Sequence, residues 1–280
     1  MPELPELEVV SEVLRRRVLG QTIAGVQVAG AGALVVRDLT HAGFAPALTG
    51  SQIVQVERRG KFLLFTLAGA LAPAPLFLVV NPKLTGRLQW CEPDEKRMPR
   101  THVVFTLSGG RQLRYVDQKR MGQLYLTRAP SEVPDFAAMG PEALDIALDD
   151  FRSRIRKFRG EIKGVLTRGD FVAGIGNAYA DEILWNARLY PFRKRTSLGP
   201  EEIERLYGAM RETLLDATAK VRAEMGEDIH RTPREFMAVH MHTGEPCPRC
   251  GTTVSLIGAN QRITNFCRTC QPGSMFRGGL

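Results

Sequence analysis

The 280-residue sequence lacks any apolar run close to the roughly 20 residues that a membrane-spanning helix requires. Its first residues, MPELPELEVV, supply acids and prolines where a secretory signal peptide needs basic and then apolar residues. It also lacks internal repeats and low-complexity tracts. We therefore expect a cytoplasmic protein without membrane attachment, folded as one large or two medium globular domains.

Cysteine is scarce, and its placement is uneven. Of the 5 cysteines, Cys91 stands alone, whereas Cys247, Cys250, Cys267 and Cys270 fall within 24 residues. In a cytoplasmic chain this clustering favours a metal site over disulfides or four unliganded thiols. The two Cys-x-x-Cys pairs can place four thiolates around one tetrahedral Zn²⁺. Because such a site has no open position, we predict one structural zinc ion, and a zinc-dependent hydrolase is disfavoured.

Acidic residues are fewer than basic ones. The chain has 30 Asp and Glu against 38 Lys and Arg, which gives a net charge of +8. Two basic segments flank an acidic stretch over residues 127–150. Charge alone leaves two interpretations open, a nucleic-acid-binding protein or a generally basic soluble protein.

Residues 3–126 predict a helix followed by strands. Residues 3–18 have the periodicity of an amphipathic helix, which Gly20 ends. From position 22 to 126, strand-length apolar runs alternate with turn signals, which indicates a β-sandwich or barrel. These runs are IAGVQV (23–28), ALVVRD (33–38), QIVQVERRGKFLLFTL (52–67), LFLVV (76–80), THVVFTL (101–107), RQLRYVD (111–117) and GQLYL (122–126).

The second half of the chain predicts helices. RAPSEVPDF, residues 128–136, is rich in proline and acid and is typical of a linker. Residues 147–159 and 199–225 are long and helically periodic, and residues 225–235 predict a polar loop. We expect MAVHM (237–241) and TTVSLI (252–257) to be strands of the cysteine unit.

Seven motifs together resemble one family, the formamidopyrimidine-DNA glycosylases and endonuclease VIII. The motifs are PELPE (2–6), RRGKFLLF (58–65), LTGRL (84–88), LRYVD (113–117), IKGVL (162–166), GIGNAYADEIL (174–184) and the cysteine-bearing GEPCPRCG with NQRITNFCRTCQ. Each occurs in the order and at roughly the spacing of that family, so the combination is specific although no single motif would suffice.

The resemblance implies a multidomain α+β fold. An N-terminal helix would lie on a two-layer β-sandwich, followed by a helical domain with a helix–two-turn–helix motif and a zinc-finger hairpin. We accordingly expect a catalytic sandwich domain, a linker, a helix–two-turn–helix domain, a zinc finger and a tail. Their bounds are 1–127, 128–150, 151–235, 236–273 and 274–280.

The resemblance also implies a function. The family removes oxidised bases, of the formamidopyrimidine and 8-oxoguanine type, from damaged double-stranded DNA and then nicks the strand by β,δ-elimination. We expect a monomer with zinc as its cofactor. Two alternatives remain open, a preference for oxidised pyrimidines as in endonuclease VIII, or a non-catalytic protein that binds damaged DNA. The presence of Pro2, Glu3 and Lys163 favours the enzyme.

Catalytic roles follow from the resemblance. Pro2 would be the nucleophile once Met1 is removed, and Glu3 would move protons at the deoxyribose, with Glu6 in support. By themselves, Glu3 and Glu6 would indicate only compensation of a helix dipole. The nucleophile makes chemical sense, because an α-amino group titrates near ~8 whereas lysine titrates near ~10.4. Lys61 matches the family lysine that grips a phosphate at the lesion.

DNA-binding roles follow in the same way, with one departure from the family pattern. Lys163, Asn177 and Arg262 match phosphate-contacting positions. An enzyme that evicts a base must also plug the gap in the duplex. Family members that excise 8-oxoguanine use methionine, arginine and phenylalanine there, whereas the corresponding residues here are Leu84, Lys119 and Met121, with Arg120 retained. The wedge stays apolar, but the choice of opposite base is expected to be relaxed.

Overall fold

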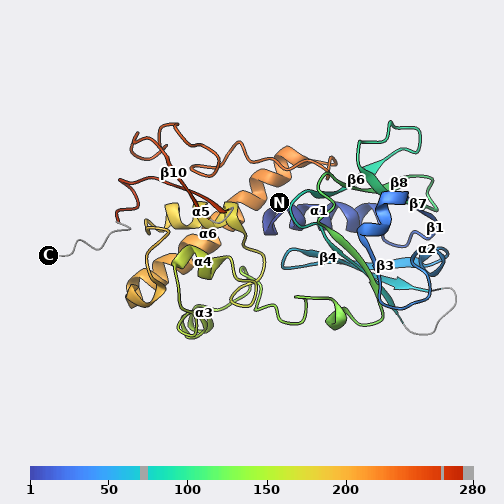
Figure 1. Ribbon diagram of the computed structural model, residues 1–280, viewed down its shortest axis with the longest axis horizontal. Coiled ribbons are helices and arrows are strands. Elements are labelled where there is room, and N and C mark those ends of the chain that lie inside the picture. The colour runs from blue at the N-terminus through green and yellow to red at the C-terminus, as the bar shows by residue number, and fades with distance from the viewer. Residues whose placement is uncertain (70–74, 260–261, 274–280) are drawn as a thin grey trace. The chain divides into compact units, whose positions relative to one another are not determined.

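The computed structural model describes residues 1–69, 75–259 and 262–273, with backbone alone for positions 259 and 262. The chain forms two compact units (Figure 1). Unit 1 comprises Met1–Ala138 and Val221–Pro233, and unit 2 comprises Met139–Lys220 and Arg234–Leu280. Within the described ranges, no helix has the length and apolar character needed to cross a membrane.

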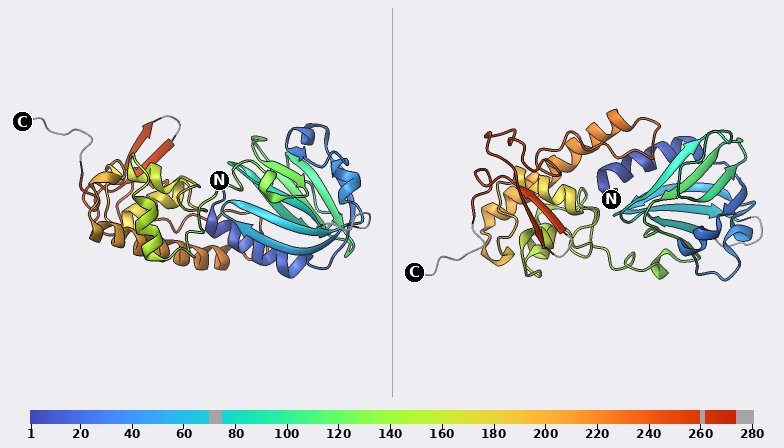
Figure 2. Two further views of the ribbon diagram at one scale, coloured as in Figure 1. Left: turned by 90° about the horizontal axis from the view of Figure 1, so that it is seen from below. Right: turned by 45° about the horizontal axis from the view of Figure 1, so that its top comes forward.

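Unit 1 contains two β-sheets, which Figure 2 shows as two layers. The four-stranded sheet has the order β1 (Ile23–Val28), β7 (Thr101–Leu107), β8 (Gln112–Asp117), β6 (Gly86–Cys91). The five-stranded sheet has the order β2 (Val36–Asp38), β9 (Gln123–Thr127), β5 (Leu76–Asn81), β4 (Phe62–Ala68), β3 (Gln52–Arg59). Neighbouring strands are antiparallel except β2 and β9. The predicted sandwich is confirmed.

Helix α1 (Leu4–Val18) packs against β3 and β4. Apolar residues spaced three and four apart, such as Leu7, Val10 and Leu14, form its buried face. Pro5 lies in the first turn, where a missing N–H is no loss. Gly20 follows the helix with φ +78°, as predicted for its end.

The hairpin between β3 and β4 corrects one prediction. Residues 52–67 read as one strand-like run, but Arg59 pairs with Phe62 across a turn at Gly60 and Lys61. Gly60 has φ +57°, a conformation that favours glycine. Lys61 therefore lies on the tip of a hairpin and not within a strand.

The segment 33–38 is only partly a strand. A 3₁₀ helix, η1 (Gly30–Leu34), precedes the short β2. A Cβ on Gly32 would lie 2.4 Å from the carbonyl oxygen of His102, so glycine lets η1 approach β7 closely. The short helix α2 (Phe44–Leu48), the 3₁₀ helix η2 (Pro130–Glu132) and strand β6 had no counterpart among the predicted elements.

Unit 2 is mainly helical. Its elements are α3 (Leu148–Ile155), α4 (Ile162–Leu166), α5 (Asn177–Asn186), η3 (Arg195–Ser197), α6 (Pro200–Met225, its last turn in unit 1), β10 (Ser255–Ala259) and β11 (Arg262–Phe266). The ring of Phe151 packs 5.2 Å from that of Phe171 and 5.4 Å from that of Tyr207. The two predicted long helices are confirmed, the first in shortened form, whereas α4 and α5 were not predicted as helices.

The predicted strand over 237–241 is wrong. The backbone N–H groups of Ala238, Val239 and His240 donate to the carboxylate of Glu182, at 2.7, 2.9 and 2.8 Å. Because these donors bind a side chain, they are not available to a β-ladder. The neighbouring prediction is confirmed for residues 255–257, which lie in β10 and pair with β11.

Candidate active site

The start of α1 fixes Pro2 and Glu3. Glu3 precedes the helix in an extended conformation, and its backbone N–H donates to Glu6 Oε2 at 2.8 Å. Pro2, Glu3 and Glu6 are all buried, with Glu3 and Glu6 each 1% exposed. Pro2 and two carboxyl groups thus lie within five residues on a segment held by the helix.

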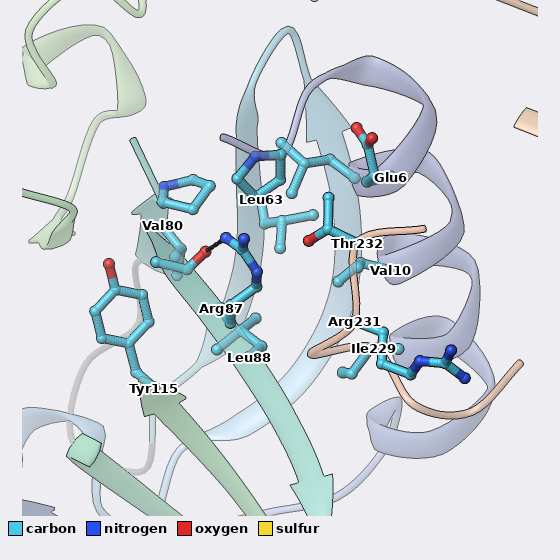
Figure 3. A pocket seen from close by; sticks show the side chains of 14 residues that line it. Glu6, Val10, Leu63, Val80, Arg87, Leu88, Tyr115, Ile229, Arg231 and Thr232 are labelled. Carbon is cyan, nitrogen blue, oxygen red and sulfur yellow. Dashed lines mark hydrogen bonds between the residues drawn. The ribbon is translucent and has the colours of Figure 1, made fainter. Parts of the chain in front are cut away.

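A small cavity adjoins Pro2 (Figure 3). Its volume is about 20 Å³, and its walls come from α1, β4, β5, β6, β8 and residues 229–232. Arg87 crosses it and donates to the carbonyl oxygen of Gly86 at 3.0 Å. This volume accommodates about one water molecule and no nucleobase. A base must therefore bind outside this cavity.

Arg58 secures the turn that carries Lys61. Its Nε donates to Glu8 Oε2 of α1 at 2.6 Å, and its Nη1 donates to the carbonyl oxygen of Gly60 at 3.1 Å. The Arg58 side chain is only 8% exposed, so water screens this ion pair less than one on the surface. Lys61, half-buried at the tip, is thereby tied to the helix that begins at Leu4.

Asp117 joins the two loops that hold Leu84 and Met121. Gly86 pairs with Asp117 in the sheet, so the loop before β6 and the loop after β8 meet at one edge. The Asp117 carboxylate accepts hydrogen bonds from the Thr85 hydroxyl and from the N–H groups of Lys119 (3.2 Å) and Gly122 (2.8 Å). The Lys119 N–H also donates to the Thr85 hydroxyl at 3.0 Å. One buried carboxylate therefore fixes both loops together.

The side chains at the tips of these loops face solvent. Leu84 is 38% exposed and Met121 is 51% exposed, and Lys119 and Arg120 beside Met121 are exposed too. Arg120 has φ +53°, which marks a tight loop. Exposed apolar side chains beside cations suit insertion between bases next to phosphates.

The buried Tyr115 side chain lies next to Asp117 and Gly122, at the base of the loop that carries Met121. Its hydroxyl lies 3.4 Å from Asp117 Oδ2, and burial raises the pKa of this phenol well above its ordinary value. It therefore stays a neutral hydrogen-bond donor. A Cβ on Gly122 would lie 1.9 Å from the Tyr115 hydroxyl, so only glycine fits at the end of the loop.

Lys163 occupies a different environment from the one that its motif suggests. Its Nζ lies 2.6 Å from Asp181 Oδ1, 2.8 Å from the carbonyl oxygen of Ile263 and 2.9 Å from Thr264 Oγ1. The residue is 7% exposed. Lys163 thus fastens β11 to helices α4 and α5 within unit 2.

Asn177 joins the same strand. It begins α5, and its Nδ2 donates to the carbonyl oxygen of Ile263 at 2.8 Å. Gly174, with φ +102°, precedes it in the turn. Arg262, the first residue of β11, has a side chain outside the described residues, as do Asn260 and Gln261 at the predicted hairpin tip.

The four clustered cysteines form a centre suited to zinc. Their sulfur atoms all lie within 4.8 Å of one another, with Cys247–Cys270 at 3.9 Å and Cys250–Cys267 at 3.4 Å. Tetrahedral Zn²⁺ with bonds of ~2.3 Å separates its sulfur ligands by about 3.8 Å. The donor set and spacing therefore fit one structural zinc ion.

Three family models match the chain in sequence order. They describe the N-terminal domain of formamidopyrimidine-DNA glycosylase (residues 1–124), its H2TH domain (138–227), and a zinc finger found in FPG and IleRS (244–273). The chain belongs to the formamidopyrimidine-DNA glycosylase family. It is thus a DNA glycosylase of a family with AP lyase activity, which confirms the enzyme interpretation and the fold expected from the motifs.

Individual relatives agree with this assignment. The formamidopyrimidine-DNA glycosylase of Symbiobacterium thermophilum is 38% identical, over 97% of this chain and 90% of that protein. The enzyme of Moorella thermoacetica is 40% identical over 90% and 92%. The crystal structure of MutM (Fpg) from Thermus thermophilus superposes with a TM-score of 0.82 at 34% identity, over 98% of this chain and all of that one. MutM in complex with DNA containing carbocyclic 8-oxo-G gives 0.83 at 30% identity, over 97% and 100%.

Sequence reasoning missed several residues that position the site. Asp117 belongs to the LRYVD motif but received no role, and Thr85, Arg58 and Asp181 also went unassigned. A signal was present for Asp117, because an aspartate at the end of an apolar strand and before a loop often binds the loop N–H groups. No comparable signal marks Asp181, since its partners are distant in the sequence.

Removal of a zinc ligand should unfold the finger. We expect Cys247→Ser to lose the zinc ion and to lower the midpoint of thermal unfolding of unit 2, because the hairpin has little core of its own. Metal analysis and thermal scans check this. Cys91→Ala removes a thiol outside the cluster and should keep one zinc per chain. A Cys247→Ser protein with full zinc content would contradict the assignment.

Proposed function

We propose that this glycosylase removes oxidised purines of the formamidopyrimidine and 8-oxoguanine type from damaged double-stranded DNA, as a monomer, and then nicks the strand at the abasic site. The burial of Pro2, Glu3 and Glu6 together at the start of α1 is the observation that carries the proposal. Relatives solved with abasic and 8-oxo-G DNA support the substrate class. Its bacterial relatives support work on the chromosome in the cytoplasm.

Pro2 is the proposed nucleophile. After removal of Met1, the lone pair of its secondary amine attacks C1′ of the damaged nucleotide, and the bond from C1′ to the base breaks as the base takes up a proton. Opening of the sugar ring then gives an iminium, which is cationic without an extra proton. Loss of the C2′ proton lets this iminium take up the electrons of the C2′–H bond as an enamine, which expels the 3′ phosphate with the electron pair of its C–O bond. Loss of the C4′ proton then expels the 5′ phosphate in the same way.

Glu3 and Glu6 have separate proposed roles. Glu3 protonates the deoxyribose ring oxygen and thereby promotes ring opening. Glu6 accepts the Glu3 backbone N–H at 2.8 Å, so it holds the Pro2–Glu3 peptide in one orientation. Such positioning matters because a misplacement of about 1 Å can cost roughly a hundredfold in rate.

The proposed DNA contacts divide into direct and indirect ones. Lys61, Lys119, Arg120 and Arg262 supply positive charge to phosphates, and Asn177 adds a side-chain donor at the start of α5. Lys163 acts by holding β11, which begins at Arg262, since its ammonium group already has three partners within unit 2.

Leu84 and Met121 are the proposed wedge. They enter the stack when the damaged base leaves, because an unfilled gap costs a few kcal/mol of stacking. Lys119 offers a point charge where arginine offers a planar fork of donors, so it cannot bind a base edge in bidentate fashion. Met121 also lacks a flat aromatic face. The opposite base should therefore be chosen less strictly.

The nucleophile can be tested by trapping. Borohydride should reduce the iminium and leave a covalent complex with abasic-site DNA that maps to Pro2, and Pro2→Gly should trap at least tenfold more slowly. Pro5→Ala, in the first turn of α1, leaves the terminal amine in place and should trap as well as wild type. Equal trapping by Pro2→Gly, mapped to another residue, would refute the assignment.

The wedge can be tested by comparing two substrates. Leu84→Ala should slow excision of 8-oxoguanine from duplex roughly tenfold or more, about 1.4 kcal/mol, because the gap is no longer filled. Nicking of a preformed abasic site should change little, since no base is evicted. Leu39→Ala removes a leucine of similar exposure, 36% against 38%, and should leave both rates unchanged. Equal losses on both substrates would show that Leu84 has another role.

The choice of opposite base follows from Lys119 and Met121. Replacing Lys119 with Arg and Met121 with Phe together should increase the preference for cytosine over adenine opposite the lesion by roughly tenfold, since a bidentate base contact is worth ~1–3 kcal/mol. Excision rates opposite all four bases measure this. Lys96→Arg, at an exposed lysine of another loop, is the matched control. An unchanged preference would mean that other residues read the partner strand.

A further inference from the structure

Trp185, near the end of α5, contacts the predicted zinc centre directly. Its indole Nε1–H points at Cys247 Sγ, with nitrogen and sulfur 3.3 Å apart. The half-buried ring packs against the buried cluster of Val239, Val254 and three of the cysteines, Cys247, Cys267 and Cys270. Trp185 is not part of either Cys-x-x-Cys pair, so this donor reaches the metal ligand from a helix of the preceding domain.

Arg249 stacks on the indole ring of Trp185 and also binds its backbone. Its guanidinium carbon lies 3.9 Å from the centroid of the indole ring, and its Nη1 donates to the carbonyl oxygen of Trp185 at 2.9 Å. Arg249 lies between Cys247 and Cys250 in the sequence CPRC. The segment Cys247–Cys250 thus contacts Trp185 through the Cys247 sulfur, the stacked Arg249 guanidinium and a hydrogen bond from Arg249 to the Trp185 backbone.

The start of α5 is hydrogen-bonded to strand β11 of the zinc-finger hairpin. Asn177 donates to the carbonyl oxygen of Ile263, and the Asn265 N–H donates to Asp181 Oδ2 at 3.2 Å. Helix α5 is therefore fastened at its start to β11 and at its end to the first cysteine pair. Loss of the contact at Trp185 would leave that cysteine pair attached to α5 at fewer points.

A hydrogen bond to a metal-bound thiolate has two physical effects. It offsets part of the negative charge that four thiolates bring to one Zn²⁺, and it fixes the orientation of the sulfur. Partners of metal ligands that act in this way typically change metal affinity by about 10- to 100-fold when they are replaced. An N–H donor at 3.3 Å in a partly apolar surrounding is well placed for both effects.

We propose that Trp185 is a positioning residue of the zinc centre, which stabilises the Cys247 thiolate through its indole N–H and sets how firmly the metal is retained. Trp185→Phe keeps an aromatic ring for Arg249 and the cluster but removes the donor. This inference concerns the metal site alone and does not depend on the proposed roles of Pro2 or Leu84.

Zinc transfer to a chromophoric chelator from the full-length zinc-loaded protein tests the proposal. Trp185→Phe should release zinc about tenfold faster than wild type. Trp90→Phe is the matched control, because Trp90 Nε1 has no hydrogen-bond partner among the described residues and lies in unit 1. Release at the wild-type rate from Trp185→Phe would overturn the proposal.

A spectroscopic measurement separates the hydrogen bond from packing. In the cobalt-substituted protein, the thiolate-to-cobalt charge-transfer band should move to lower energy in Trp185→Phe, because a thiolate without its donor gives up an electron more readily. Arg249→Lys loosens the stacking but keeps the positive charge and the Trp185 N–H, so its band should stay at the wild-type energy. An equal shift in both variants would assign the effect to packing and overturn the proposal.

The wild-type protein provides a test that needs no variant. With NMR-active cadmium in the site, the Trp185 indole proton should show a scalar coupling to the metal through the sulfur, and the Trp90 proton should show none. A resolved Trp185 signal without that coupling would overturn the proposal even if Trp185→Phe fails to fold.

Discussion

Buried carboxylates that accept backbone N–H groups hold the functional segments of this enzyme in place. Glu6, Asp117, Asp181 and Glu182 are each at most 7% exposed. A buried carboxylate without donors is costly, so each one must collect hydrogen bonds from its surroundings. For Glu6, Asp117 and Glu182 the donors come from segments outside any β-ladder: the peptide before α1, the loop after β8 and residues 238–240. The hydrogen bonds that satisfy each buried carboxylate therefore also fix the backbone segment that donates them.

This constraint explains why the proposed catalytic and wedge residues lie on segments whose backbone is fixed. Glu6 fixes the peptide that bears Pro2, and Asp117 fixes both loops that bear Leu84 and Met121. The supports are buried, whereas the tips of the two loops face solvent. Rigid supports limit the conformational entropy lost when DNA binds, and they hold reacting groups near productive geometry. At both places, a hydrogen bond from a backbone N–H to a buried carboxylate holds a proposed functional residue in position.

The sequence predicts what local pattern determines and misses what distant partners determine. The periodicity of α1 and α6, the cysteine spacing and the strand-length apolar runs predicted the long helices, a sandwich or barrel and a metal centre, whereas the complete fold came from the family resemblance. Residues 237–241 looked like a strand, but Glu182, more than fifty residues earlier in the sequence, captures their N–H groups. Lys61 looked like a strand residue until Gly60, with its left-handed backbone, made the turn. The motifs predicted roles for Pro2 and Glu3 through resemblance, whereas the support of the loops by Asp117 is visible only in the three-dimensional structure.

Lys163 is a lysine whose positive charge is paired within unit 2. Its ammonium group lies 2.6 Å from Asp181, which is fully buried, so much of its field is cancelled before it reaches solvent. His240 Nδ1 and the Asn265 N–H bind the other oxygen of that carboxylate, at 2.9 and 3.2 Å. These bonds hold Asp181 in place beside Lys163. Lys119 and Arg120 are exposed on their loop instead, and the loop is held through the backbone N–H of Lys119 rather than through its ammonium group. We infer that Lys163 serves DNA binding through the position of β11, and that the exposed cations supply the electrostatic attraction.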